Sequence, residues 1–280
     1  MIRIIVAVHF LFLSASLMAQ ELESELLFYG DVMTYAFEDE NRMRAANEFT
    51  ELLMTYLGKD PMLEKEADFK KYLIVLDLDE GRKLISWKAR LKAHEYRYGC
   101  YLLEKGKDPK RFTRTEALTA DMAFMTSTAD DWYGCQYYNF KKMSKDKYLI
   151  LGIDPTSEYD NQKIADVLIF NKDGSITLGG PHFEDKESPG TYANRIIISY
   201  SSDAAVTFNY NPQLDILIKD HLESRLGMQA GQGATNIPDG TYEGYKLEKD
   251  KWMYVEKIFD HVYETAPIPK PTQSGLFKGK

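Results

Sequence analysis

The chain has 280 residues and a formal net charge of −8, and aromatic residues make up 13% of it, with 19 tyrosines. An acidic surface repels phosphate backbones and anionic lipids, which argues against nucleic acids and anionic membrane surfaces as partners. The length suits one large β-type domain, or one and a half domains. The tyrosine content favours pleated sheets over a helical bundle.

Residues 1–19 have the pattern of a secretory signal peptide. Arg3 supplies a positive start, the segment 4–13 is almost entirely apolar, and small residues lead to Ala19. This apolar run is too short to anchor the chain in a bilayer. We expect cleavage after Ala19, with cleavage after Ser16 as the alternative. The protein is therefore predicted to be secreted or periplasmic, with no integral membrane segment after cleavage.

Residues 20–68 are predicted to form a helical segment that packs on the rest of the protein. One apolar stripe repeats with the period of a helix, and it consists of Ala45, Phe49, Leu52, Leu53 and Tyr56. Gly58 is placed to end this helix in a left-handed conformation. Asp60-Pro61 is typical of the start of a further short helix. An earlier helix is expected from Leu22 to Ala36.

A β-rich domain is predicted over residues 69–263, because the apolar period changes to two after Tyr72. The expected strands are Leu73–Leu78, Lys83–Leu91, Glu95–Leu103, Trp132–Phe140, Tyr148–Ile153, Ile164–Asn171, Ile176–Leu178, Ile196–Tyr200, Ala205–Tyr210, Leu214–Ile218, Tyr242–Leu247 and Trp252–Lys257. Turn sequences separate them, among them Asn171-Lys172-Asp173-Gly174 and Pro238-Asp239-Gly240. The Pro- and Gly-containing end, residues 264–280, is expected to be a disordered tail.

The predicted fold class is mainly β, an antiparallel meander with an N-terminal α-helical segment. The strands are arranged as a sandwich, as a barrel-like sheet or as an incomplete propeller. The last option depends on a Tyr-Gly-Cys sequence that occurs twice, at Tyr98-Gly99-Cys100 and at Tyr133-Gly134-Cys135. Two partial copies do not establish a repeat, so the sandwich and the barrel-like meander stay ahead.

Three segments carry a resemblance to a known family. They are Leu84-Ile85-Ser86-Trp87 leading to Tyr96-Arg97-Tyr98-Gly99, Trp132-Tyr133-Gly134 through Tyr148–Asp154, and Lys163–Leu168 through the Pro238–Tyr242 hairpin. In the order of these motifs the chain resembles a family of exported proteins of unknown function from Bacteroidetes-type bacteria. The resemblance covers about residues 70–260. It implies export and a β-rich fold, and it implies no reaction and no functional residue.

Cys100 and Cys135 are the two cysteines of the chain, and each follows a Tyr-Gly pair. An even number of cysteines in an exported protein favours a disulfide. If the two strands are neighbours, the sulfur atoms come within bonding distance. We therefore expect a Cys100–Cys135 bridge, with two buried free thiols as the alternative.

Carboxylates occur at two places that suggest chemistry. The loop from Asp154 to Asn161 carries three of them and could offer oxygen ligands to calcium, but its spacing matches no calcium motif and favours a solvated turn. Asp166 shares a strand face with apolar side chains, so it must be hydrogen-bonded or have a raised pKa. It is a candidate general acid, partnered by Asp154 or Asp215, or a structural group that accepts backbone N–H bonds from a loop.

The strand around residue 135 is dense in aromatic side chains, namely Trp132, Tyr133, Tyr137, Tyr138 and Phe140. Such side chains stack on sugars and apolar ligands when they are exposed, and in a sheet they more often pack in the core. The scattered histidines have no zinc spacing, and the Gly-rich segment 227–233 lacks the features of a phosphate loop. No metal and no cofactor is predicted.

The sequence favours an exported, non-enzymatic binding or envelope-associated module whose partner is an unidentified protein or glycan. The alternative is a carboxylate-dependent hydrolase of envelope or extracellular polymers, working through a pair such as Asp154 and Asp166. Glycoside hydrolysis requires two carboxyl groups about 5–10 Å apart across a cleft.

Overall fold

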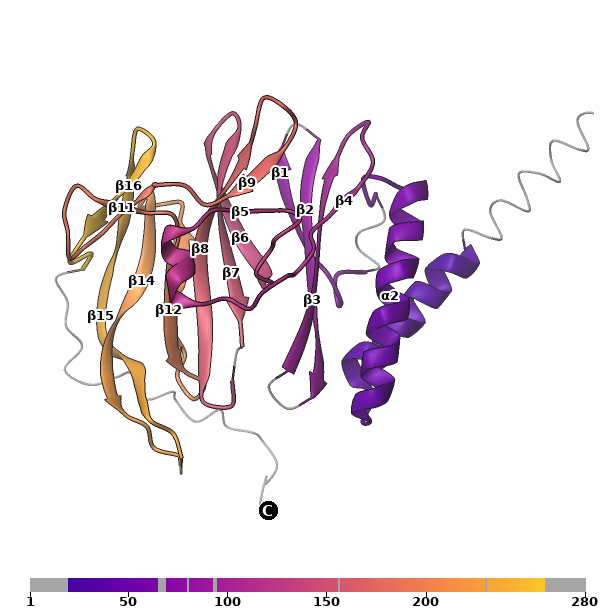
Figure 1. Ribbon diagram of the computed structural model, residues 1–280, viewed down its shortest axis with the longest axis horizontal. Helices are drawn as coiled ribbons and strands as arrows, with labels where there is room; N and C mark the ends of the chain where they lie inside the picture. The colour runs from indigo at the N-terminus through magenta and orange to yellow at the C-terminus, as the bar shows by residue number, and fades with distance from the viewer. Residues whose placement is uncertain are drawn as a thin grey trace, which may run out of the picture.

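The computed structural model describes residues 20–64, 69–79, 81–92, 95–155, 157–229 and 231–259. Four layers are stacked side by side: a pair of helices and then three sheets (Figure 1). The predicted signal peptide and the predicted tail lie outside the described residues. No described helix is long and apolar enough to cross a membrane.

The helical layer contains a first helix, residues 20–35, and α2 (Asp39–Lys59). The predicted stripe is turned inward, with Phe49 and Leu53 fully buried. The prediction for Gly58 is wrong, because α2 continues through it and ends at Lys59. Asp60 leaves the helical conformation (φ −127°, ψ 77°) because it precedes Pro61, whose ring disfavours a helical residue before it. Residues 61–64 form a turn in which the Asp60 carboxylate accepts the Glu64 N–H (2.8 Å), and the following residues of the predicted short helix, 65–68, lie outside the described residues.

The first sheet packs against the helices. Its order is β1 (Ile74–Asp79), β2 (Arg82–Lys92), β3 (Glu95–Glu104) and β4 (Lys110–Arg111). One face contributes Ile85, Trp87 and Tyr101 to a core shared with the helices. The other face contributes Leu84 and Cys100 to a core shared with the middle sheet. The period-two alternation predicted for these strands thus separates two cores.

The middle sheet has the order β5 (Ser127–Thr128), β9 (Ile176–Leu178), β8 (Asp160–Phe170), β7 (Lys147–Asp154) and β6 (Gln136–Ser144), and β12 (Ile196–Ser201) also pairs with β8. The short helix η1 (Ala120–Phe124) lies in the connection before β5. β6 begins later than predicted because Gly134, at φ +83°, interrupts the extended chain. Gly174, at φ +84°, forms the predicted hairpin turn between β8 and β9.

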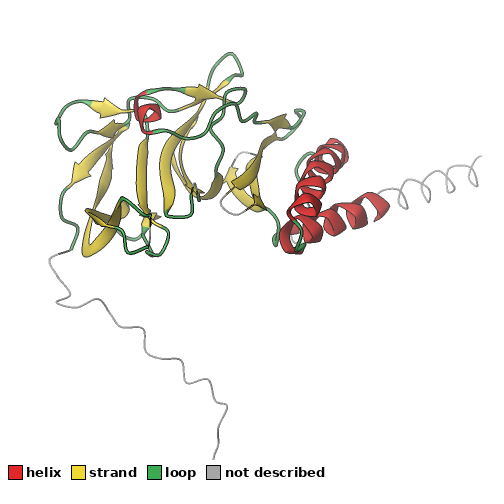
Figure 2. Cartoon of the chain, turned by 60° about the horizontal axis from the view of Figure 1, so that its bottom comes forward, coloured by secondary structure: helices red, strands yellow, loops and turns green. Residues whose placement is uncertain are grey.

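The last sheet has the order β11 (Tyr192–Ala193), β10 (Phe183–Glu184), β16 (Lys251–Val255), β15 (Ala234–Glu248), β14 (Ile216–Leu226) and β13 (Phe208–Asn211). It shares a third core with the middle sheet, including Leu149, Phe208 and Trp252. Figure 2 shows the sheets stacked away from the helices.

A bulge replaces the turn predicted at Pro238-Asp239-Gly240. Asp220 pairs with Tyr242 and Leu222 pairs with Pro238, so His221 alone faces three residues of β15. Gly240 has the positive φ (+90°) that the sequence suggested, but the strand continues on both sides of it. A bulge redirects side chains at that point, and here it brings His221 beside Asp239.

The predicted fold class is confirmed: the protein is mainly β, with an N-terminal helical segment. Each of the three sheets is open in its strand order, so the arrangement is a stack of sheets and not a barrel. The two Tyr-Gly-Cys sequences have different structural roles. Gly99 lies beneath the Trp87 indole, where a Cβ atom would come within 2.2 Å of Nε1, whereas Gly134 adopts a positive φ. They are not copies of one repeat.

Candidate functional site

The cysteines do not form the predicted bridge. Cys100 and Cys135 are both buried free thiols. Cys100 lies in β3 of the first sheet and Cys135 precedes β6 of the middle sheet, so the residues do not belong to paired strands. The two thiols lie in one core and are close enough to interact, but they are not bonded to each other. Burial raises the pKa of both thiols well above the ordinary range, which makes them unreactive.

Asp166 is a structural anchor. It is fully buried and accepts hydrogen bonds from Arg195 Nε (2.9 Å) and from the Tyr133 hydroxyl (2.9 Å). Arg195 is fully buried too, and its Nη1 donates to the Met122 carbonyl of η1 while Nη2 donates to Leu178 C=O. The carboxylate therefore ties a loop to the sheet, as the structural interpretation predicted. Its partner is an arginine, not a set of loop amides.

The three carboxylates considered for acid–base chemistry do not meet. Asp154 is opposite Gln162 on β8, and Asp166 is four residues further along that strand, a separation of about 13 Å. Asp154 accepts a hydrogen bond from the buried hydroxyl of Tyr98, and burial raises its pKa. Asp215 lies beside β14 in the last sheet and binds the Tyr210 hydroxyl. Asp154 and Asp166 are both buried, so they do not face each other across an open cleft.

The loop after Asp154 makes turn contacts. Ser157 Oγ accepts the backbone N–H of Asp160 (2.9 Å), and the Asp160 carboxylate accepts the Thr235 hydroxyl (2.6 Å). Across the described ranges, no group of three or more His, Cys, Asp or Glu side chains could hold a metal ion.

The aromatic strand belongs to the core. Trp132, Tyr133 and Tyr137 are fully buried. The Trp132 indole donates to the Tyr137 hydroxyl (3.0 Å), which lies 3.1 Å from that of Tyr133. Tyr138 and Phe140 are half-buried, and the Tyr138 hydroxyl donates to the Phe208 carbonyl. This strand is not a surface platform for sugars.

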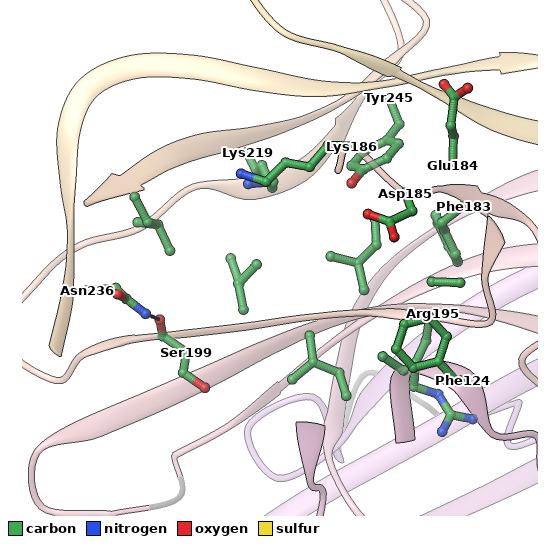
Figure 3. Close-up of a pocket in the computed structure, with 16 residues that line it drawn as sticks. Phe124, Phe183, Glu184, Asp185, Lys186, Arg195, Ser199, Lys219, Asn236 and Tyr245 are labelled. Atoms are coloured by element: carbon green, nitrogen blue, oxygen red, sulfur yellow. Dashed lines mark hydrogen bonds between the residues drawn. The ribbon is translucent and has the colours of Figure 1, made fainter. Parts of the chain in front are cut away.

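A cleft between the middle and last sheets has the features of a ligand site. Its volume is about 350 Å³, within the usual range for small-molecule pockets. Four consecutive residues of β12, from Ile196 to Ser199, line one side, and residues of β10, β14 and β15 line the other (Figure 3). Phe124, on η1, lies at the rim with 68% of its surface exposed. The lining is mostly apolar, and a few polar side chains converge on it.

The polar wall of the cleft centres on Lys219. This lysine is buried and forms an ion pair with Glu243, the residue directly opposite on β15. The Tyr254 hydroxyl also donates to Glu243. Burial lowers the pKa of Lys219 and the bond from Glu243 opposes that shift. Figure 3 shows the Lys186 and Lys219 ammonium groups close together above the cavity.

A second polar site lies on the other side of Glu243, at the bulge. His221 Nδ1 is 2.8 Å from the Asp239 carboxylate, and Thr241 donates its backbone N–H and its hydroxyl to that same carboxylate. Burial would raise the pKa of Asp239, but these hydrogen bonds hold it below its ordinary value. The imidazole is 39% exposed and lines a polar cavity of about 940 Å³ that also includes Glu243.

The sequence missed both polar sites for identifiable reasons. Lys219 follows the apolar residues Leu217 and Ile218. Asp166 is singled out because alternation places it on an apolar strand face, and the same reasoning applies to this lysine. His221 and Asp239 are 18 positions apart, and only the pairing of β14 with β15 brings them together. Comparison of the chain with protein-family models, curated proteins and solved structures finds no match. The geometry of the chain itself is therefore what bears on function.

Proposed function

We propose that the protein is an exported, non-enzymatic binding module that holds a small, partly apolar ligand in the cleft between β12 and the last sheet. The composition of that cleft supports this proposal most directly. The cavity has a volume of about 350 Å³, Ile196, Ile198 and Phe183 lie along it, and the buried Lys219 stands on one wall. Sites of this size with apolar linings and a few convergent polar groups typically bind small organic molecules. The exposed Phe124 at the rim supports the same proposal, because an aromatic ring there gains contact area when a ligand enters.

The proposed binding is tested with the neutral fluorescent probe N-phenyl-1-naphthylamine. We expect a saturable rise in fluorescence when the purified protein is titrated. Phe124→Ala should weaken binding about fivefold, equivalent to the loss of about 1 kcal/mol of apolar contact. Phe28→Ala is the matched control, because Phe28 is similarly exposed (60%) but lies on the first helix. Absence of saturable binding, or equal weakening by both substitutions, would contradict the proposal.

Export is supported by the pattern over residues 1–19 and by the resemblance to exported proteins. It is tested separately by expressing the full chain in a bacterium and sequencing the amino terminus of the mature product. We expect the mature protein to begin at Gln20, or at Leu17 if cleavage follows Ser16. A cytoplasmic product that still begins at Met1 would contradict export and leave the cleft proposal unaffected.

A further inference from the structure

Successive residues of β12 direct their backbone N–H and C=O groups to opposite edges of the strand. The last pair with β8 is Ser201 and Asp160. At the next position, the Ser202 N–H donates to the Tyr159 carbonyl. Because alternate residues of a strand direct their backbone groups to the same side, the even-numbered residues of β12 direct theirs toward β8. Ser199 is odd-numbered, and its carbonyl accepts a hydrogen bond from the Asn236 side chain (2.9 Å) on β15. Ile197 therefore also directs its N–H and C=O away from β8 and along the outer edge of the sheet.

Ile197 is the open position of this edge. On one side, the Arg195 N–H is held by the Ala123 carbonyl of η1, and on the other the Ser199 carbonyl is covered by Asn236. Within the described ranges, neither the N–H nor the C=O of Ile197 has a hydrogen-bond partner, and Ile197 lines the cleft. A strand edge with a free donor and a free acceptor pairs readily with an added extended chain.

The opposite wall carries an ion pair that a ligand can exchange. Lys186 lies near the buried Lys219–Glu243 pair, and its Nζ atom is 3.9 Å from the carboxylate of Glu187. Glu184 and Asp185 bind backbone N–H groups instead, those of Tyr254 and Glu187. The Glu187 side chain is 80% exposed, so its ion pair with Lys186 is weak, and the carboxylate of a ligand in the cavity can take its place. Figure 3 shows both lysine side chains over the cavity.

The geometry points to a short peptide with a free terminal carboxylate as the ligand, and this inference rests on the proposed function. One residue of the peptide pairs antiparallel with Ile197, donating its N–H to the Ile197 carbonyl and accepting the Ile197 N–H. Its apolar side chains contact Ile196, Ile198 and Phe124, and its carboxylate lies near Lys186. A simple acyl chain fits the apolar lining equally well but offers nothing to the Ile197 backbone.

The test uses N-acetyl-Ala-Leu-Ala with a free carboxylate, titrated by calorimetry into the purified protein. Ile197→Pro removes the outward N–H and no ladder hydrogen bond, because proline is tolerated where the N–H points away from the neighbouring strand. We expect this variant to bind the peptide about tenfold more weakly, since one hydrogen bond is lost. Ile197→Val keeps the N–H and should bind within about twofold of the unmodified protein.

Two changes in the ligand give independent readouts. Methylation of the leucine nitrogen should weaken binding about tenfold if leucine is the residue that pairs with Ile197. Replacement of the terminal carboxylate by a carboxamide should weaken binding about fivefold, and Lys186→Ala should remove that difference. Lys107→Ala is the matched control, because Lys107 is an exposed lysine with one carboxylate partner, far from the cleft along the chain.

The outcomes are distinguishable. If the naphthylamine probe binds and the peptide does not, the peptide inference is overturned and the proposed function stands. If neither binds, the proposed function itself fails. If Ile197→Pro also loses the probe, the variant has disturbed the cleft, and the methylated peptide decides: weaker binding than the parent peptide supports the pairing, and equal binding overturns it.

Discussion

Lys219 and Glu243 lie directly opposite each other on β14 and β15 and form an ion pair whose side chains are 9% and 2% exposed. The pair stands on the wall of the cleft, between the apolar cavity beside β12 and the polar cavity that contains His221. Burial would raise the pKa of Glu243, but hydrogen bonds from Lys219 and Tyr254 hold it below its ordinary value. The stabilisation from Glu243 is therefore present above pH 4.5 and is lost as the pH falls through its lowered pKa.

Substitution of Glu243 should leave a buried ammonium group without its counter-charge. We expect Glu243→Gln to lower the free energy of unfolding by about 3–5 kcal/mol at pH 7, measured by urea denaturation. Part of the loss should be recovered toward pH 10. Burial lowers the pKa of Lys219 in the folded protein, whereas in the unfolded chain this pKa is about 10.4. Between the two pKa values, Lys219 is protonated in the unfolded chain and neutral in the folded protein. The free energy of unfolding therefore rises with pH in this interval.

Glu223→Gln is the control for this substitution, because Glu223 forms an ion pair with Arg225 on an exposed part of β14, the strand that carries Lys219. A surface change of this kind should cost no more than about 0.5 kcal/mol. Equal effects of the two glutamine substitutions would show that the Lys219–Glu243 pair is not buried.

The Asp166–Arg195 pair makes a second stability prediction. Asp166→Asn and Arg195→Met should each cost about 3–5 kcal/mol, because each leaves one fully buried charge unpaired. The double variant should cost less than the sum of the two, and a double-mutant cycle measures the coupling. Because Arg195 also holds the Met122 carbonyl of η1, Arg195→Met should weaken probe binding at the Phe124 rim. Additive single effects would argue against the pair.

Two glycines should respond in opposite directions to alanine. Gly58 lies in α2 with no atom within 4 Å of an added Cβ, so Gly58→Ala should stabilise the protein by about 0.5–1 kcal/mol. Gly244 pairs with Ile218 in the last sheet, and an added Cβ would lie 2.1 Å from the Leu217 carbonyl oxygen. Gly244→Ala should therefore destabilise the protein by about 2 kcal/mol or more. Thermal melts of the two variants moving in the same direction would be inconsistent with this structure.

The cysteines should behave as buried thiols. A thiol reagent should label neither Cys100 nor Cys135 in the folded protein, because burial raises both pKa values, and should label both after denaturation without reductant. Mass spectrometry counts the labels. A denatured, unreduced protein with no reactive thiol would show that the sequence-based disulfide prediction was correct after all.

Much of the fold follows from the sequence because its signals are local. The strand from Ile176 to Leu178 occurs where alternation predicts it, and Gly174 forms the predicted turn. The errors arise where a local signal has two structural solutions. Gly240 requires a positive φ in a turn and in a bulge alike, and only the pairing of β14 with β15 decides between them. The disulfide prediction for Cys100 and Cys135 is wrong for the same reason, because the sequence of a strand does not specify which other strand lies next to it.

The cleft could not be predicted in the same way. Ile197 is one apolar residue in an ordinary strand, and its backbone becomes an open edge only because η1 and Asn236 cover the positions on either side of it. Lys219 carried a usable signal, since a charged residue stood in an apolar strand. Its partner Glu243 is 24 positions away, which places the pair beyond any local pattern.

The most direct test of the cleft and its open edge is an amide nuclear magnetic resonance titration of the isotope-labelled protein with N-acetyl-Ala-Leu-Ala. We expect saturable shifts at Ile197, Ser199 and Phe124, together with slower hydrogen exchange of the Ile197 amide in the bound state. Saturable shifts confined to other parts of the molecule, with the Ile197 amide unchanged in both shift and exchange rate, would contradict the proposed pairing.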